Sequence, residues 1–325
     1  MKEVFIVTGG FFDGSSEGYI GKVFLLRSKS KKISLRFEVS IITEPPTPSL
    51  RVKNKGFAGG SIYNNHLWLC SSNQVLAYSL PDFELTQVID DPLFNDLHYV
   101  LPEKDGLFVV NTGLESLDYF NYDGKLINRT LLTSDERTIQ RTRAVPDFRV
   151  INSKPHFMHA NYCFRKDDGH MLLTLVRQRR IVDTGNWGWA SPEYSASPHE
   201  GFIAYYAPIN KDCLWVTTVP GEIIASDIVT GEIIKKWDLK NSQIAPGWTR
   251  GLYILVDGFL VGVTKIRSSN AGYYSGWGKE DVENSRTTVS YIPFENKLPT
   301  VSIDVLNDRN SKVFSILSAD KSMQL

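Results

Sequence analysis

Three of the six histidines and one arginine stand at comparable places in the chain, where strand-like runs begin. They are His98 in Asp-Leu-His-Tyr, His159 in Met-His-Ala-Asn, His199 in Pro-His-Glu-Gly and Arg250 in Trp-Thr-Arg-Gly. An imidazole transfers protons near neutral pH, and a guanidinium pairs with carboxylates or phosphates. If the fold brings these four side chains together, we expect a catalytic site for an anionic small molecule.

Three imidazoles around one point are also a typical ligand set for a divalent ion such as zinc, iron, manganese or calcium. We therefore predict His98, His159 and His199 as metal ligands as well as catalytic residues. The alternative is a structural role, in which each histidine hydrogen-bonds neighbouring backbone inside a polar channel. Arg250 has a similar alternative, because arginines also brace adjacent elements by donating to loop carbonyls.

The remaining candidates for chemistry receive ordinary interpretations. Glu200 follows His199 and alternates to the opposite strand face, so we expect a surface carboxylate or one between neighbouring sheets, with a ligand as the alternative. His66, His156 and His170 follow turn residues and are expected to be solvent-side or packing residues.

Aromatic residues gather in two segments that interrupt the strand pattern, at about 183–197 and 267–287. Long loops with aromatic residues among glycines form lids that stack on a ligand and exclude water. We predict substrate contacts from these lids and from a residue beside Arg250, namely Trp187, Trp189, Tyr273, Tyr274, Trp277 and Trp248. Alternatively, the two segments pack on each other or on a second subunit of a homo-oligomer.

The elements that must position these residues are short strands. Runs of five to eight strand-forming residues alternate with turns such as Asp105-Gly106, and helical periodicity is nearly absent. The segment from Asn95 to Leu132 holds four such runs in about forty residues, which is the length of a propeller blade. Similar units begin near residues 57, 157, 200 and 248.

The N-terminal segment supplies only three strands, and a lone strand remains at Lys312–Leu317. If this strand completes the N-terminal unit, a ring closes and no sheet edge stays unpaired. We therefore predict an all-β fold over residues 1–325, a single six-bladed β-propeller with four-stranded antiparallel blades and a three-plus-one closing blade. A β-sandwich or two stacked sheets is the alternative.

The first strand of each blade lines the axis of a propeller, which explains why the candidate residues would meet. His98 and Arg250 precede their Asp-Gly turns by the same number of residues, whereas His159 is two residues farther from Asp168-Gly169. His199 matches by blade order only. Small residues near Gly59 occupy the corresponding place in another blade and would leave room at the axis.

Composition limits the class of partner. The 36 basic residues balance 36 acidic ones, so there is no global field for nucleic acid or an anionic membrane, and we expect neither partner. The three cysteines Cys70, Cys163 and Cys213 lie in strand-like surroundings and predict buried thiols in a reducing cytoplasm. The apolar run near the start of the chain is too short for the hydrophobic region of a signal segment, so we expect none. No Gly-rich phosphate loop is present, and no nucleotide cofactor is expected.

The stretches Gly247–Gly251, Val261–Arg267 and Val110–Ser116 resemble an uncharacterised bacterial six-bladed propeller family that occurs alone or fused to tetratricopeptide-repeat proteins. More remotely, the chain resembles the NHL and strictosidine-synthase-like propellers. This resemblance covers most of the chain after about residue 55 and implies the fold. It implies no single activity, and the acidic metal-ligand set of propeller lactonases is not recognisable.

Two hypotheses follow for function. The first is a small-molecule enzyme with an axial histidine cluster that performs a lyase, isomerase or hydrolase step in a biosynthetic pathway. The second is a non-catalytic ligand sensor or protein-interaction scaffold with the aromatic segments as its docking surface.

Overall fold

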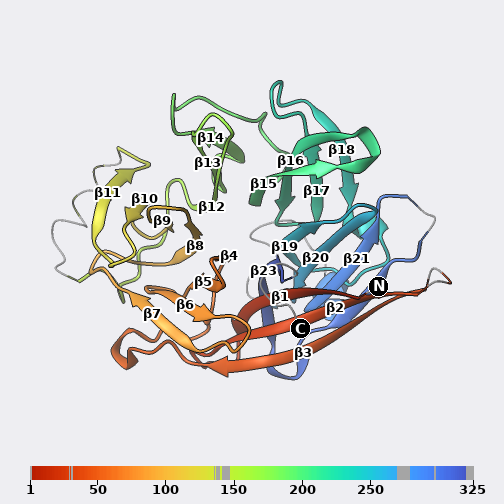
Figure 1. Ribbon diagram of the computed structural model, residues 1–325, viewed down its shortest axis with the longest axis horizontal. Coiled ribbons are helices and arrows are strands. Elements are labelled where there is room, and N and C mark those ends of the chain that lie inside the picture. Colours follow the sequence, from red (N-terminus) through yellow and green to blue (C-terminus); the bar gives the residue numbers. More distant parts are fainter. Residues whose placement is uncertain are drawn as a thin grey trace.

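The computed structural model of the chain describes residues 2–28, 30, 32–134, 136, 140, 147–268, 279–295 and 298–319. Nearly all of these residues belong to strands and their turns (Figure 1). No helix among them is long and apolar enough to cross a bilayer. The strands form six antiparallel sheets that surround a common axis as a six-bladed β-propeller, which confirms the predicted fold class.

The first three blades, named here in chain order, are four-stranded sheets. Blade 1 consists of β23 (Ser311–Ser318), β1 (Lys2–Phe11), β2 (Gly18–Arg27) and β3 (Ile33–Thr43). Blade 2 consists of β4 (Gly60–Tyr63), β5 (His66–Cys70), β6 (Val75–Ser79) and β7 (Leu85–Ile89). Blade 3 consists of β8 (Leu97–Pro102), β9 (Leu107–Asn111), β10 (Ser116–Phe120) and β11 (Leu126–Leu131).

The other three blades complete the ring. Blade 4 consists of β12 (Ala160–Arg165), β13 (Met171–Leu175) and β14 (Arg180–Asp183). Blade 5 consists of β15 (Pro198–Tyr206), β16 (Lys211–Thr218), β17 (Glu222–Ser226) and β18 (Ile233–Asp238). Blade 6 consists of β19 (Trp248–Ile254), β20 (Gly258–Thr264), β21 (Thr288–Pro293) and β22 (Val301–Asp304).

The ring closes through the C-terminal strand. β23 pairs antiparallel with β1, and Val7 stands opposite Ile316 in the ladder. The innermost strands β23, β4, β8, β12, β15 and β19 each contact the next one around the axis, and β19 returns to β23 (Figure 1). This is the predicted three-plus-one closure, and it leaves no inner strand without neighbours on both sides.

Blade 4 departs from the predicted four-stranded pattern because its sheet contains three strands. The segment after β14 lies at the outer edge of this sheet and pairs with it at a single antiparallel bridge, between Val182 and Trp189. The amide of Ala190 donates to the carbonyl of Ile181 at 2.9 Å. Part of the predicted insertion at 183–197 is therefore the blade's own short outer edge. Most of the second predicted insertion lies outside the described residues, and its described part includes the short helix α3 (Lys279–Asn284).

The core lies between neighbouring blades, where apolar residues of alternating strand positions meet. One cluster joins blades 1 and 6 through side chains such as Phe5, Tyr19, Val289 and Tyr291. Burial of these side chains holds adjacent blades together by the hydrophobic effect, because a single blade is too thin to bury them alone. Cys70, Cys163 and Cys213 are free, buried thiols, as the sequence predicts.

Candidate functional site

The axial residues occupy irregular positions of the inner strands. The ladder register shifts at residue 98 of β8, at 161 of β12, at 199–200 of β15 and at 250–251 of β19, and β23 shifts at residue 314. A β-bulge turns its extra residue out of the regular alternation and bends the strand. Five of the six blades thus present a bulge residue toward the axis, namely Phe314, His98, Asn161, His199 and Arg250.

Asn161, and not His159, holds the place that His98 holds in its blade. Asn161 precedes Asp168 by the same separation as His98 precedes Asp105. His159 lies in the loop just before β12, with a positive φ of 53°. Its backbone N–H and that of Met158 donate to the carboxylate of Glu115 at 3.3 and 2.7 Å. The two-residue offset visible in the sequence is therefore real, and His159 reaches the axis from a loop.

In blade 2 the residue just before the inner strand β4 is a glycine, and its backbone contacts blade 3. The amide of Gly59 donates to the carbonyl of His98 at 2.9 Å. A Cβ atom at Gly59 would lie 2.6 Å from that oxygen, so the close contact between the two blades requires glycine.

The bulges and loops enclose an axial pocket with a volume of about 360 Å³. It brings together all four predicted catalytic residues and one predicted substrate contact, namely His98, His159, His199, Arg250 and Trp248. The ring centroid of His98 lies 5.2 Å from that of His159 and 6.4 Å from that of His199.

The other predicted substrate contacts lie elsewhere. Trp187 and Trp189 are half exposed, and Trp189 bridges to the outer strand of blade 4, the part of the blade farthest from the axis. Neither lines the axial pocket. Tyr273, Tyr274 and Trp277 lie outside the described residues.

The described residues give no support to the divalent ion that the sequence predicts. Among the described residues, no three histidine, cysteine, aspartate or glutamate side chains are arranged to hold a metal ion. Six lysine and arginine side chains also line the pocket, and positive charge at this density opposes a cation. The ion stays a prediction from the sequence, which metal analysis of the purified protein would test.

Positive charge dominates the pocket walls. The basic residues are Lys53, Lys55, Lys154, Arg250, Arg267 and Lys312, and Asp96 is the one carboxylate among the described lining residues. Lys312 is 3% exposed, and its ammonium group donates to the carbonyl of Asn54 at 2.9 Å. Burial, together with the charges of Lys55 and Arg250, lowers the pKa of Lys312 well below its ordinary value. A bound anion would relieve this repulsion.

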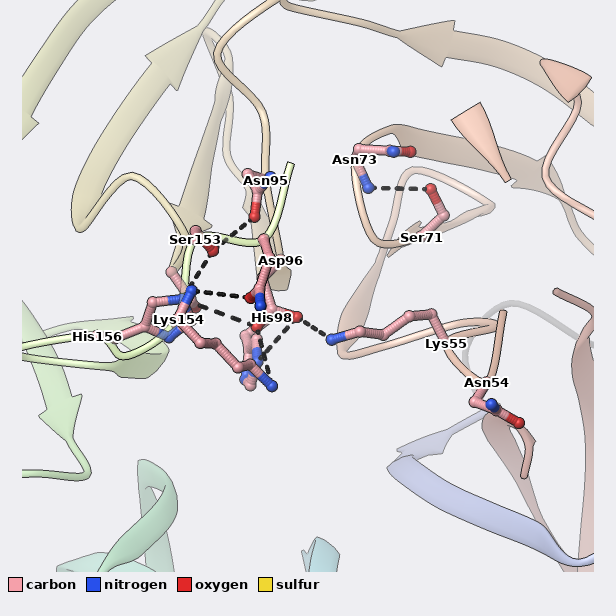
Figure 2. Close-up of polar contacts among 12 residues, drawn as sticks. Asn54, Lys55, Ser71, Asn73, Asn95, Asp96, His98, Ser153, Lys154 and His156 are labelled. Atoms are coloured by element: carbon pink, nitrogen blue, oxygen red, sulfur yellow. Dashed lines mark hydrogen bonds and ion pairs between the residues drawn. The ribbon is translucent and has the colours of Figure 1, made fainter. Parts of the chain in front are cut away.

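Asp96 connects loops from three blades at the pocket rim (Figure 2). Its carboxylate accepts a hydrogen bond from Lys55 and lies 3.7 Å from the ammonium group of Lys154. Burial opposes its ionisation, but the neighbouring groups Lys55, His98 and Lys154 hold the pKa of Asp96 well below its usual value. The carboxylate is therefore ionised and interacts with two of the cationic side chains, Lys55 and Lys154.

A chain of hydrogen bonds fixes the tautomer of His159. The amide nitrogen of Asn95 donates to two backbone carbonyls, those of Phe148 and Ile151, so its oxygen is free to accept from the Ser153 hydroxyl at 2.8 Å (Figure 2). Ser153 Oγ lies 2.9 Å from Nε2 of His156. The Ser153 hydroxyl donates its one proton to Asn95, so towards His156 it can only accept. Nε2 of His156 therefore carries a proton and donates it to Ser153 Oγ.

The hydrogen-bond chain continues from His156 to His159. The Nδ1 atoms of His156 and His159 lie 2.8 Å apart, and Nδ1 of His156 carries no proton once Nε2 does. His159 therefore donates from Nδ1 and keeps an unprotonated Nε2. Burial lowers the pKa of His156 to about 4 and that of His159 to about 3, so both rings are neutral at pH 7.

The other two imidazoles also have unsatisfied nitrogens. His199 is 5% exposed, and neither of its ring nitrogens has a hydrogen-bond partner among the described residues. Nδ1 of His98 is likewise buried and unpartnered there. Burial lowers the pKa of both rings well below the ordinary value, which keeps them neutral. Buried polar atoms of this kind are rare in proteins unless a ligand or water meets them.

Glu200 is buried between blades, which favours the second of its two predicted interpretations. It is 4% exposed, its amide donates to Oγ1 of Thr217 at 3.0 Å, and its Oε2 has no partner among the described residues. Burial raises the pKa of Glu200 to about 8, so the carboxyl group is largely protonated at pH 7. The rings of Tyr99 and Tyr162 stack with centroids 3.8 Å apart, and both tyrosines interact electrostatically with Glu200.

The sequence does not identify several of the residues that form the site. His156, expected to be a packing or solvent-side residue, is buried and supports His159 directly. Lys55, Asp96 and Lys154 come from loops that no periodic pattern marks. Lys312 opens the predicted closing strand, and its place at the start of an inner strand is the sequence signal that marks it.

Comparison with known proteins supports the fold alone. No family model and no curated protein matches the chain, so its resemblance to a particular propeller family rests on the sequence motifs. A protein of unknown function from Bacteroides caccae is similar in structure, with a TM-score of 0.60, 11% identity and coverage of 97% of this chain and 98% of that one.

Two further structures show the same architecture at low identity. A chain from a nidogen/laminin complex has a TM-score of 0.55 and 9% identity, and 98% of both chains is covered. A streptogramin B lyase has a TM-score of 0.51 and 11% identity, covering 98% of this chain and 93% of that one. The neighbours include an enzyme and a member of a protein complex, so the shared architecture does not specify a function.

Proposed function

We propose that the chain is an enzyme that binds a small organic anion in the axial pocket and catalyses a lyase or isomerase step by moving a proton through His159. One observation carries this proposal: the hydrogen-bond chain from Asn95, which assigns an unprotonated Nε2 to His159, ends at a residue that lines a pocket with six lysine and arginine side chains and one carboxylate. A positioned base beside fixed positive charge suits the removal of a proton next to an acyl or carboxylate group.

The charges explain how the base would become active. Burial and neighbouring cations by themselves make His159 a weak base. An anionic substrate supplies the missing negative charge, which favours the imidazolium and raises the proton affinity of His159. Catalysis is thereby coupled to the binding of a ligand of the correct charge.

The proton transfer is balanced within the pocket. His159 Nε2 takes the proton from a carbon atom, and the C–H electron pair moves toward the adjacent acyl group. The developing negative charge on oxygen faces the guanidinium of Arg250 and the ammonium of Lys312. Return of the proton to a neighbouring carbon gives an isomerase, and departure of a group from that carbon, which takes the electron pair, gives a lyase.

The same pocket would serve the alternative function, a sensor that binds an anion without turnover. Both functions share the binding step, so only chemistry separates them. The free, buried thiols fit a reducing compartment, and we extend the proposal to the cytoplasm on that basis.

The experiment is a screen for proton exchange. The purified protein is incubated in D2O with small carboxylates and phosphate esters, and NMR follows loss of C–H signals and appearance of products. We expect exchange or turnover with at least one anion and a loss of about 100-fold or more in His159→Gln. The matched control is His170→Gln, at a half-exposed histidine outside the pocket. Tight binding of an anion with no exchange in the wild type would favour the sensor.

A further inference from the structure

Three cations and three aromatic rings alternate around one side of the axial pocket. The Arg267 guanidinium lies 4.3 Å from the ring of Phe12 and 5.5 Å from that of Trp248. Arg250 lies 5.6 Å from the Trp248 ring and 4.3 Å from the Phe314 ring. The Lys312 ammonium lies 5.2 Å from Phe314 and 5.0 Å from Phe12. We call this closed arrangement the cation–aromatic ring.

Each aromatic side chain of the ring separates two like charges. The faces of the three aromatic groups stabilise the cations and keep them apart at fixed positions. The three cations come from β19, from the segment after β20 and from β23, so ring closure of the propeller is needed to assemble them. All six residues line the pocket. The arrangement is thus a preformed set of positive groups around a shared space.

Within this set, the positive charge of Lys312 has no negatively charged partner among the described residues. Its side chain is buried, and no described carboxylate forms an ion pair with it. The charged groups that act on it are Lys55, Arg250 and Arg267, which repel its proton, and Asp96, which attracts it. Like charges this close in a desolvated site destabilise one another unless an anion lies between them.

We infer that the axial pocket takes a phosphate-bearing small molecule, with the phosphate group held by Arg250, Arg267 and Lys312 and the rest of the molecule directed toward the imidazoles. This inference rests on the proposed function, whose substrate class it names. A carboxylate carries one charge and is satisfied by one guanidinium fork, whereas a phosphate dianion offers three oxygens and two charges to three cations.

The distances allow one small molecule to span both parts of the pocket. The ring of Phe314 belongs to the cation–aromatic ring and lies 6.4 Å from the His98 ring and 6.1 Å from the His199 ring. A phosphate held beside Phe314 therefore places the adjoining carbon atoms near the imidazoles. The pocket volume of about 360 Å³ suits a phosphate ester of a few carbons.

The test is calorimetric titration at low salt with inorganic phosphate, acetate and succinate as probes. We expect phosphate to bind at least tenfold more tightly than either carboxylate. Lys312→Met, which keeps the buried stem without the charge, should weaken phosphate binding tenfold or more. The control Lys236→Met changes a half-exposed lysine on the outer strand of blade 5 and should leave affinity unchanged.

A second readout uses two buffers of different ionisation enthalpy. Phosphate should raise the pKa of Lys312 on binding, because its negative charge offsets the repulsion from the neighbouring cations, and Lys312→Met should lose any proton exchange with the buffer that this shift causes. Succinate binding as tightly as phosphate would overturn the phosphate assignment and leave the anion pocket intact. No binding of any probe would overturn both proposals. Phosphate binding without exchange chemistry in the D2O screen would overturn the enzyme proposal alone.

Discussion

The Nδ1 atoms of His156 and His159 lie 2.8 Å apart, and this contact decides which nitrogen of His159 is available as a base. We predict that nitrogen-15 NMR of the histidine side chains finds His159 protonated at Nδ1 and unprotonated at Nε2. Ser153→Ala removes the acceptor that fixes His156 and should populate the opposite tautomer of His159.

Ser153→Thr is the matched control for this prediction, because it keeps the hydroxyl and should preserve the wild-type tautomer. With a substrate in hand, Ser153→Ala should lower kcat about tenfold or more with little change in KM, since Ser153 positions the base and touches no substrate. A wild-type His159 protonated at Nε2 would contradict the assignment.

Removal of the Asp96 charge should change phosphate affinity and the free energy of unfolding in opposite directions. Asp96→Asn removes the one negative charge among the described pocket residues, so phosphate affinity should rise about tenfold. The same change leaves Lys55 and Lys154 without their shared partner, and the free energy of unfolding should fall by about 1 to 3 kcal/mol.

Calorimetry and urea denaturation measure the two effects. Asp105→Asn, at an exposed turn residue of blade 3, should change neither affinity nor stability. Weaker phosphate binding in a folded Asp96→Asn protein would argue that Asp96 contacts the ligand directly.

Glu200 makes stability depend on pH. Its pKa is raised from 4.5 to about 8 in the folded protein, so the folded state holds a proton that the unfolded state has released between these values. The free energy of unfolding therefore falls as pH rises from about 4.5 to 8 and is flat with respect to this group above that range.

Glu200→Gln should abolish this fall, because the amide stays neutral in both states. We expect the variant to gain stability over the wild type by about 2 to 4 kcal/mol between pH 5 and pH 9, as measured by urea denaturation. Glu232→Gln, at an exposed position of blade 5, should follow the wild-type curve. Parallel curves for Glu200→Gln and wild type would show that Glu200 is ionised in the folded protein.

Gly9 couples closure of the ring to the pocket. A Cβ atom there would lie 1.9 Å from the carbonyl oxygen of Lys312 and 2.7 Å from the ring of Tyr19. Gly9→Ala should therefore force β23 away from β1 and lower the free energy of unfolding by about 2 to 4 kcal/mol. Because β23 carries Lys312, phosphate affinity should fall as well.

The control for this prediction is Gly14→Ala, in the turn after β1. Gly14 has a φ of +91°, and a Cβ atom at this position would meet no described atom within 4 Å. Only the backbone conformation therefore opposes alanine there, at about 1 kcal/mol. Thermal unfolding and calorimetry compare the two variants. Equal losses in both would mean that the β1–β23 contact is not tight.

Most of the strands, and their order, follow from the sequence alone, with the three-stranded blade 4 as the exception. Alternating runs and Asp-Gly turns are local signals, and a repeat of about forty residues indicates blades regardless of what touches what. The lone strand at Lys312–Leu317 implied closure, since an unpaired edge is unfavourable. His98, His199 and Arg250 could be found because each sits at the start of an inner strand.

Only the tertiary structure decided how the pocket works. Lys55, Lys154 and His156 lie in loops whose positions depend on packing between blades, and no spacing in the chain marks them. Asn161 occupies the bulge of β12, and His159 reaches the axis from the loop before that strand, where its backbone N–H donates to Glu115 of blade 3. Propensity and periodicity act over a few residues, whereas the charge balance of the axis sums side chains from blades far apart in the chain.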